Sequence, residues 1–333
     1  MVLNNEKKRR KRGKRLFEEF RAQGGQDACV LATLIVGIIN LISFGVYEWK
    51  GTKTGIIHHE LFPGNEHDQT FALCVALIFI EGIMLFSYVI FYPVLTTNLF
   101  DSNPFLLAAR SQVFWIACGL STAVYGFAST KLRSIRSPMF VGFLIFTAGI
   151  VGFATVQPNE STNAVAFAGL AGLGFGAPLV LVVAGVQLST PHPFIATAIA
   201  VTTSARAVAA TTFTAIFSAA LTTRLDKLLP DGTAKAAVGA GLPPQSLQLL
   251  VSALISNNAT AIAAVPGMTP AILEASGQAM KQVFADGLRV VYIIAALFGV
   301  LACISCFFLG NLTHVITYRV DAPVEGLHSK YRQ

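Results

Sequence analysis

Long runs of apolar residues alternate with short polar stretches along most of the chain. A helix needs about 20 mostly apolar residues to cross a bilayer. Seven runs reach this length, at residues 28–47, 71–92, 110–128, 138–156, 164–188, 194–222 and 288–311. None alternates apolar and polar residues with a period of two, the pattern of an outer-membrane barrel. The pattern therefore predicts an all-α fold, a polytopic bundle of membrane helices.

The composition supports a membrane protein. Only 12% of the 333 residues are charged, whereas soluble domains usually have about 25%, and the mean hydropathy is +0.63. The net charge of +7 is concentrated in the N-terminal run and in short loops, so we interpret it as a topology signal and expect no nucleic-acid partner. The basic N-terminal run is a candidate to contact anionic lipid head groups.

The runs and their connections predict a domain organisation. Residues 223–287 contain the turn-forming segments LLPDG, GLPPQS and VPGMTPA, with amphipathic stretches between them, so we expect a loop subdomain on the exofacial side. The expected parts are a basic arm at 1–26, an extra membrane helix at 27–48, five bundle helices within 70–222, the loop subdomain at 223–287, the last membrane helix at 288–311 and a cytoplasmic tail at 312–333.

Basic residues in the short loops indicate the sidedness. Lys131, Arg133 and Arg136 lie in the loop 129–138, which the positive-inside rule places in the cytoplasm. The sequons at Asn159 and Asn258 then face the other side and are candidate glycosylation sites. The same parity would put the basic N-terminus outside. Either the first run does not fully cross, or a preceding helix is missing, and the sidedness of the N-terminus stays open.

Two charges stand inside apolar runs. Glu81 lies in LIFIEGIMLF and Arg206 in TTSARAVAATTF. A charge at the bilayer centre costs at least about 2.5–3.5 kcal/mol on insertion scales, and an ion pair between the two would reduce that cost. Three interpretations remain open: the pair lines a translocation path, it only fixes helix packing, or the two side chains do not meet.

The segment GLAGLGFGAP, residues 169–178, is rich in glycine. A dinucleotide fingerprint needs a preceding strand, and this segment lies within an apolar run. We expect close helix packing or a hinge, because glycine lets backbones approach and proline frees a carbonyl group. The residues concerned are Gly169, Gly172, Gly174, Gly176 and Pro178.

No catalytic set is visible in the sequence. The membrane segments hold no combination of nucleophile, base and orienting residue, and all five cysteines lie in apolar runs. The CISC segment at 303–306 has no nearby histidine or acidic residue, which favours small buried side chains over a metal or redox site. We therefore expect no enzyme activity, no catalytic residue, no metal and no cofactor.

Several segments resemble the C-terminal part of fungal major facilitator efflux proteins of the trichothecene-pump type. They include VYEWKGTKTGIIHHELF, FYPVLTTNLF, GLAGLGFGAPLVLVVAGVQLSTPH, TSARAVAATTFTAIF and VDAPVEGLHSK, within roughly 45–330. The resemblance implies the C-terminal six-helix half of a transporter, plus one preceding helix. It also implies alternating access to a central cavity, usually coupled to proton antiport, and export of small amphipathic compounds such as mycotoxins or drugs from a plasma membrane or vacuolar-type membrane.

The resemblance assigns further roles. GFASTKLRSIRS looks like a degenerate copy of the family's basic loop motif: Gly126 matches its opening glycine, Lys131 its first arginine, and Arg133 and Arg136 add positive charge, but Thr130 replaces the aspartate. Plain positive-inside anchoring is the alternative. From the residues alone, Gln187 near the end of one apolar run and Gln112 near the start of another are candidate contacts for an amphipathic substrate. Transport would require the missing N-terminal half or a homodimer. The alternative is a non-transporting membrane protein that acts by helix packing or lipid anchoring.

Overall fold

The computed structural model describes residues 35–37, 39–40, 42–47, 50, 66–101, 103–191, 194–243, 246, 249 and 265–310. The chain divides into two units, residues 1–58 and 59–333. In the first, the described residues up to Val46 belong to a short apolar helix, Ile35–Val46, and Tyr47 and Lys50 follow it. The expected membrane helix at 27–48 extends past these residues and stays a prediction. The basic arm and the tail at 312–333 lie outside the described residues.

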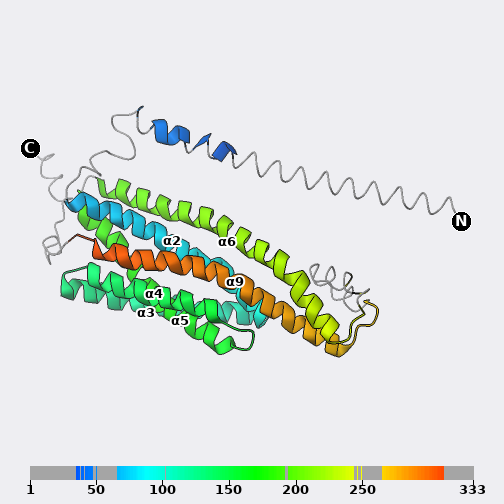
Figure 1. Ribbon diagram of the computed structural model, residues 1–333. Helices are drawn as coiled ribbons and strands as arrows, with labels where there is room; N and C mark the ends of the chain where they lie inside the picture. Colours follow the sequence, from blue (N-terminus) through cyan, green and yellow to red (C-terminus); the bar gives the residue numbers. More distant parts are fainter. Residues whose placement is uncertain are drawn as a thin grey trace, which may run out of the picture. The chain divides into compact units, whose positions relative to one another are not determined.

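The second unit is built from long helices (Figure 1). Six of its helices are long and apolar enough to cross a membrane, among the residues that the structure describes, and the predicted all-α fold is confirmed. They are α2 (Glu66–Leu99), α3 (Pro104–Leu132), α4 (Arg136–Thr155), α5 (Ser161–Ser189), α6 (Ile195–Gly239) and α9 (Pro270–Phe307).

Tight connections at α3 set its direction. Asn103 caps the start of α3 by accepting a hydrogen bond from the Phe105 N–H at 3.0 Å, and Pro104 occupies the first turn, where its missing N–H costs nothing. At the other end, Arg133 adopts a left-handed conformation with φ of 49°, which reverses the chain into α4. Helix α4 therefore runs in the opposite direction to α3, and α5 runs in the same direction as α3, because Gly172 and Gly176 face Phe114 and Ser121 in the same order.

Aromatic side chains fill the centre of this unit. Helix α5 packs against α2, α3 and α4, and α9 packs against α2, α4 and α6. The Tyr88 ring of α2 stacks on Phe114 of α3 with centroids 4.1 Å apart, and Phe153 of α4 lies 5.2 Å from Tyr292 of α9. All four side chains are buried. This cluster joins four helices and fixes how α2 faces the rest of the bundle.

Glycines in α5 allow two close helix contacts. A Cβ atom on Gly172 would lie 2.2 Å from the Phe114 carbonyl oxygen of α3, and one on Gly176 would lie 2.0 Å from Ser121 Oγ of the same helix. A Cβ on Gly174 would lie 2.1 Å from the Phe146 nitrogen of α4. Side chains do not fit at these distances, so α5 approaches both neighbours only because these positions are glycine.

Helices α6 and α9 are longer than the sequence pattern suggests. The turn expected at LLPDG lies inside α6, with Pro230 within the helix, and the amphipathic segment that begins at Thr269 continues without a break into the last apolar run. The two helices extend together past the ends of their neighbours (Figure 1). Helix boundaries near 222 and 288 were therefore wrong, whereas the exofacial placement of residues 223–287 stays a prediction.

Contacts between the extensions explain this difference. A small second core contains Ala237, Leu242, Val265 and Ile272. A Cβ on Gly232 would lie 2.8 Å from Val283 Cγ2 of α9. Burial of these groups against α9 favours the helical state strongly enough to overcome the local penalty of proline and glycine.

Polar contacts attach α9 to the turn between α4 and α5. Arg289 Nε donates to the Ala154 carbonyl oxygen at 3.0 Å, one of the four carbonyls at the α4 end that lack a partner within the helix. Gln282 Nε2 donates to Gln157 Oε1 at 3.0 Å. The paired extensions therefore emerge at the same end of the bundle as the α4–α5 turn.

Candidate functional site: a buried ion pair

The structure brings the two intramembrane charges together. Arg206 Nε of α6 donates to Glu81 Oε2 of α2 at 2.8 Å. The Glu81 side chain is fully buried, while that of Arg206 is 26% exposed. Glu81 lies near the middle of its helix, so the pair is far from the ends where side chains can reach water. The sequence argument therefore predicted the contact between Glu81 and Arg206 correctly. The contact alone does not decide between a role in transport and a role in helix packing.

The two helices are closely packed around the pair. A Cβ on Gly82 would lie 3.1 Å from the Arg206 carbonyl oxygen. Two edge-to-face ring contacts join the same helices, with centroids 6.2 Å apart for Phe79 and Phe213 and 5.8 Å apart for Phe91 and Phe217. The pair is therefore held in a preformed geometry.

Each partner keeps unused hydrogen-bonding capacity. Glu81 Oε1 and an Arg206 terminal nitrogen, Nη2, are buried and have no hydrogen-bond partner. A carboxylate has two acceptor oxygens and a guanidinium has five N–H donors, so one contact satisfies only part of the pair. The free Oε1 can take up a proton while Oε2 keeps its hydrogen bond to Arg206 Nε, and the contact then joins a neutral carboxyl group to the guanidinium.

The outward face of α6 near Arg206 differs chemically from that of α9. Exposed positions of α6 are mostly small or hydroxyl residues: Thr203, Ser204, Ala207, Thr211, Thr212, Ala215, Ser218 and Thr222. Exposed positions of α9 within residues 293–307 are large and apolar: Ile293, Leu297, Val300, Leu301, Ile304 and Phe307. Lipid-facing surfaces are apolar, whereas small and hydroxyl residues are enriched where membrane helices meet. The two faces therefore suit different neighbours.

The two glutamines expected to contact substrate are not part of this constellation. Gln112 lies in the first third of α3 and Gln187 near the end of α5, and both are exposed. Helices α3 and α5 run in the same direction, so the two side chains lie toward opposite ends of the bundle. No hydrogen bond in the described part of the chain joins either of them to Glu81 or Arg206. Their role stays a prediction.

The predicted loop motif surrounds the turn between α3 and α4. Lys131, Arg133 and Arg136 are exposed there. The Gly126 carbonyl oxygen accepts hydrogen bonds from the Ser129 and Thr130 hydroxyls at 2.8 and 3.0 Å. The Arg136 guanidinium lies over the Phe307 ring at 5.9 Å, which ties the turn to the end of α9. A latch function is not tested by these contacts and stays a prediction.

The remaining predicted residues fall in different places. Asn159 is exposed in the α4–α5 turn, as a glycosylation site requires, and Asn258 lies outside the described residues. The glycines of α5 make the close contacts given above, except Gly169, where a Cβ would lie 3.4 Å from Val113 Cγ1. Pro178 lies within an α5 that remains continuous. These contacts account for packing, and a hinge stays a prediction.

Sequence reasoning missed two buried tyrosines. The hydroxyl groups of Tyr92 and Tyr292 are buried without a hydrogen-bond partner, in the same aromatic cluster as Tyr88. Tyr88 itself donates to the Ser111 carbonyl oxygen at 3.3 Å. The signal was available, because Tyr88 and Tyr92 stand seven and eleven residues after Glu81 and so share its helix face.

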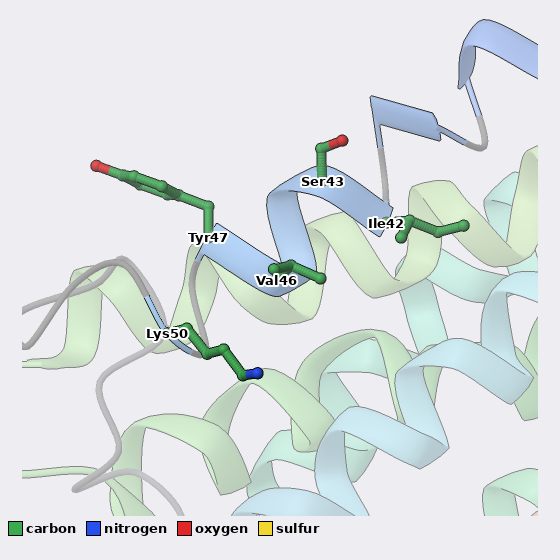
Figure 2. Close-up of a pocket in the computed structure, with 5 residues that line it drawn as sticks. All are labelled: Ile42, Ser43, Val46, Tyr47 and Lys50. Carbon is green, nitrogen blue, oxygen red and sulfur yellow. The ribbon is translucent and has the colours of Figure 1, made fainter.

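The first unit has a hollow of its own. It is lined by Ile42, Ser43, Val46, Tyr47 and Lys50 (Figure 2). All five side chains are exposed, and Figure 2 shows Tyr47 and Ser43 pointing away from Lys50. The hollow holds one charged group and no buried polar atom, so it lacks the convergent polar groups of a ligand site. Among the described residues, no cluster of histidine, cysteine and acidic side chains could hold a metal ion.

Comparison with known proteins places this architecture in a family. The model of the fungal trichothecene efflux pump family (TRI12) matches residues 22–327. The trichothecene efflux pump TRI12 of Fusarium sporotrichioides is 27% identical, over 88% of this chain and 49% of its own length. The MFS-type transporter prx5 of Penicillium rubens is 25% identical, over 84% of this chain and 52% of its own.

A third relative agrees with these. The efflux pump FUS6 of Gibberella moniliformis is 26% identical over 85% of this chain and 48% of its own length. The chain therefore spans about half the length of these curated relatives. Because the family model covers most of the sequence, the chain belongs to the fungal trichothecene efflux pump (TRI12) family.

Proposed function

We propose that the chain is one half of a membrane transporter that exports small amphipathic organic compounds by alternating access, with Glu81 and Arg206 on the translocation path. The observation that carries this proposal is the ion pair itself. A buried charge pair is costly to retain for stability alone, because apolar residues of similar volume often serve as well or better. Ionisable groups inside membrane helices usually mark substrate or ion pathways.

The second wall of the cavity is supplied by another six-helix half or by a second copy of this chain. Two observations support this. The chain covers about half of its relatives' length, and the small and hydroxyl face of α6 beside Arg206 has the chemistry of a helix contact. A partner at this face would also cover the exposed quarter of the Arg206 side chain.

Glu81 is the proposed proton carrier. Its free oxygen can take up a proton when the site is open to one side of the membrane, and Arg206 favours its release again by attracting the charged form. Substrate would be bound by the apolar surfaces and by the hydroxyl groups of α6. The proposed location is a plasma membrane or vacuolar-type membrane.

The test is flux into proteoliposomes that contain the purified chain. A proton gradient is imposed, and a radiolabelled trichothecene and a neutral lipophilic dye serve as probes. We expect gradient-driven uptake that is lost in Glu81→Gln and in Arg206→Ala. Asp286→Asn is the matched control, because it removes a carboxylate from an exposed ion pair at 3.5 Å, and it should retain flux.

The same assay decides against the alternative of a non-transporting membrane protein. Folding of every variant is checked by thermal unfolding in detergent. If the folded wild-type chain shows no flux, alone or with a co-expressed six-helix half of a relative, transport by this half is overturned. Flux that survives both Glu81→Gln and Arg206→Ala would remove the ion pair from the path.

A further inference from the structure

Gly82 is an unfavourable residue for its position in the middle of a long helix. It directly follows Glu81 in the middle of α2, among large apolar residues, and glycine is a poor helix former. A residue with this local cost needs a compensating contact. The structure supplies one, because the missing side chain leaves space on the side of α2 that faces α6.

The space beside Gly82 is bounded by the partner of the ion pair. A Cβ at Gly82 would lie 3.1 Å from the Arg206 carbonyl oxygen, 3.2 Å from Arg206 Cγ and 3.2 Å from Ala209 Cβ. The atoms around this position therefore include both the backbone and the side-chain stem of Arg206. We call this space the Gly82 notch.

Little around the notch is free to move. Glu81 is fully buried, so its carboxylate cannot follow a displaced guanidinium. The ring contacts between Phe79 and Phe213 and between Phe91 and Phe217 join the same two helices. A methyl group in the notch would push Arg206 by a few tenths of an ångström, either at its backbone or at Cγ, and would lengthen the 2.8 Å contact to Glu81.

We propose that Gly82 is a positioning residue, whose missing side chain seats Arg206 against α2 and holds its Nε within hydrogen-bond distance of Glu81. The inference that Gly82 positions Arg206 matters for transport only if the proposed function of the ion pair is correct. The positioning itself can be measured without transport, through the energetic coupling between the two charges.

The experiment is a double-mutant cycle of Glu81→Gln and Arg206→Gln on the full chain in detergent. The readout is the shift in the thermal unfolding midpoint. The cycle is run in the wild-type background and again in Gly82→Ala. We expect the coupling in the Gly82→Ala background to be less than half of the wild-type value, because contacting residues couple only while their geometry holds.

Two further variants separate positioning from general damage. Ala209→Gly removes the Cβ atom opposite the notch, so adding it to Gly82→Ala should restore part of the coupling. Gly287→Ala is the matched control. A Cβ there would lie 3.1 Å from Leu221 Cδ1 of α6, which is a similar crowding against the same helix, and its cycle should keep the wild-type coupling.

Each outcome bears on the inference. If Gly82→Ala does not fold, Ala209→Val introduces atoms into the same notch from α6 and should reduce the coupling in the same way. Unchanged coupling in the notch variants, or equal loss in Gly287→Ala, overturns the positioning role. Flux that survives both Glu81→Gln and Arg206→Ala would instead remove the ion pair from the proposed translocation path and leave the result of the cycle standing.

Discussion

Glu81 is completely buried, whereas its partner Arg206 keeps 26% of its side chain exposed, although a single 2.8 Å hydrogen bond joins them. The carboxylate therefore depends on the guanidinium more than the guanidinium depends on the carboxylate. Arg206 retains a route toward the surface of the unit. Glu81 has no other charged partner among the described ion pairs.

This asymmetry predicts unequal effects of removing either partner. Arg206→Ala should lower the free energy of unfolding by about 3–5 kcal/mol, because it leaves a buried charge unpaired. Glu81→Gln should lower the free energy of unfolding by less, because the neutral amide oxygen can still accept a hydrogen bond from Arg206 and no buried carboxylate is left unpaired. Chemical unfolding in detergent measures both values. A larger loss for Glu81→Gln than for Arg206→Ala would contradict this account of the pair.

The glycine contacts of α5 predict a graded series. Gly174→Ala should destabilise the chain by about 1–3 kcal/mol or more, because the added methyl group meets the α4 backbone and overpacks a closed interface. Gly169→Ala should cost little, since its Cβ would lie 3.4 Å from the tip of one side chain. Unfolding midpoints of the two variants check the order. Equal midpoints would show that α5 packs differently.

The contact between α9 and the α4 end predicts a local effect. Arg289→Ala should lower the free energy of unfolding by about 0.5–1 kcal/mol. The value is modest because the side chain is 41% exposed. The freed carbonyl of Ala154 should let the end of α4 open more often, so hydrogen exchange should increase in residues 153–160. Asp286→Ala keeps the carbonyl contact and serves as the control. Uniform exchange changes across the chain would argue against a local clamp.

The same contact predicts a shared side for two segments. In a background without the native cysteines, single cysteines at Asn159 and Asp231 should react with an impermeant thiol reagent from the same side of a vesicle. A cysteine at Arg133 should react from the other side. Because Gln282 and Arg289 attach the extended pair to the α4–α5 turn, labelling of Asn159 and Asp231 from opposite sides would contradict the helix arrangement.

The ion pair was accessible to sequence reasoning for a simple physical reason. The cost of an isolated charge in lipid is large, and Glu81 and Arg206 are the charges that interrupt the centres of the apolar runs. Their meeting could therefore be predicted without knowing any distance. The six long apolar helices were predictable on the same basis, because length and hydropathy are properties of the local sequence.

The features that sequence reasoning missed depend on contacts between distant segments. Pro230 and Gly232 suggest a turn when the neighbouring residues are considered alone, but α9 holds them in a helix. Gly82 stands beside a predicted site residue, yet its meaning depends on the position of the Arg206 backbone. Tertiary packing determines the conformation and the role of these residues, and the propensities of the local sequence carry no information about that packing.

The length of α6 has a mechanical consequence. The helix has 45 residues, which is about 68 Å at 1.5 Å per residue, more than twice the roughly 30 Å of hydrocarbon that a bilayer offers. Arg206 lies near its beginning, so the far end is on the order of 50 Å away, and a tilt of about 10° at the ion pair would displace the tip by about 9 Å. Because α6 packs along α9, its extension acts as a lever. A small rotation beside Glu81 becomes a movement of several ångströms at the tip, which a pair of spectroscopic probes placed there can measure.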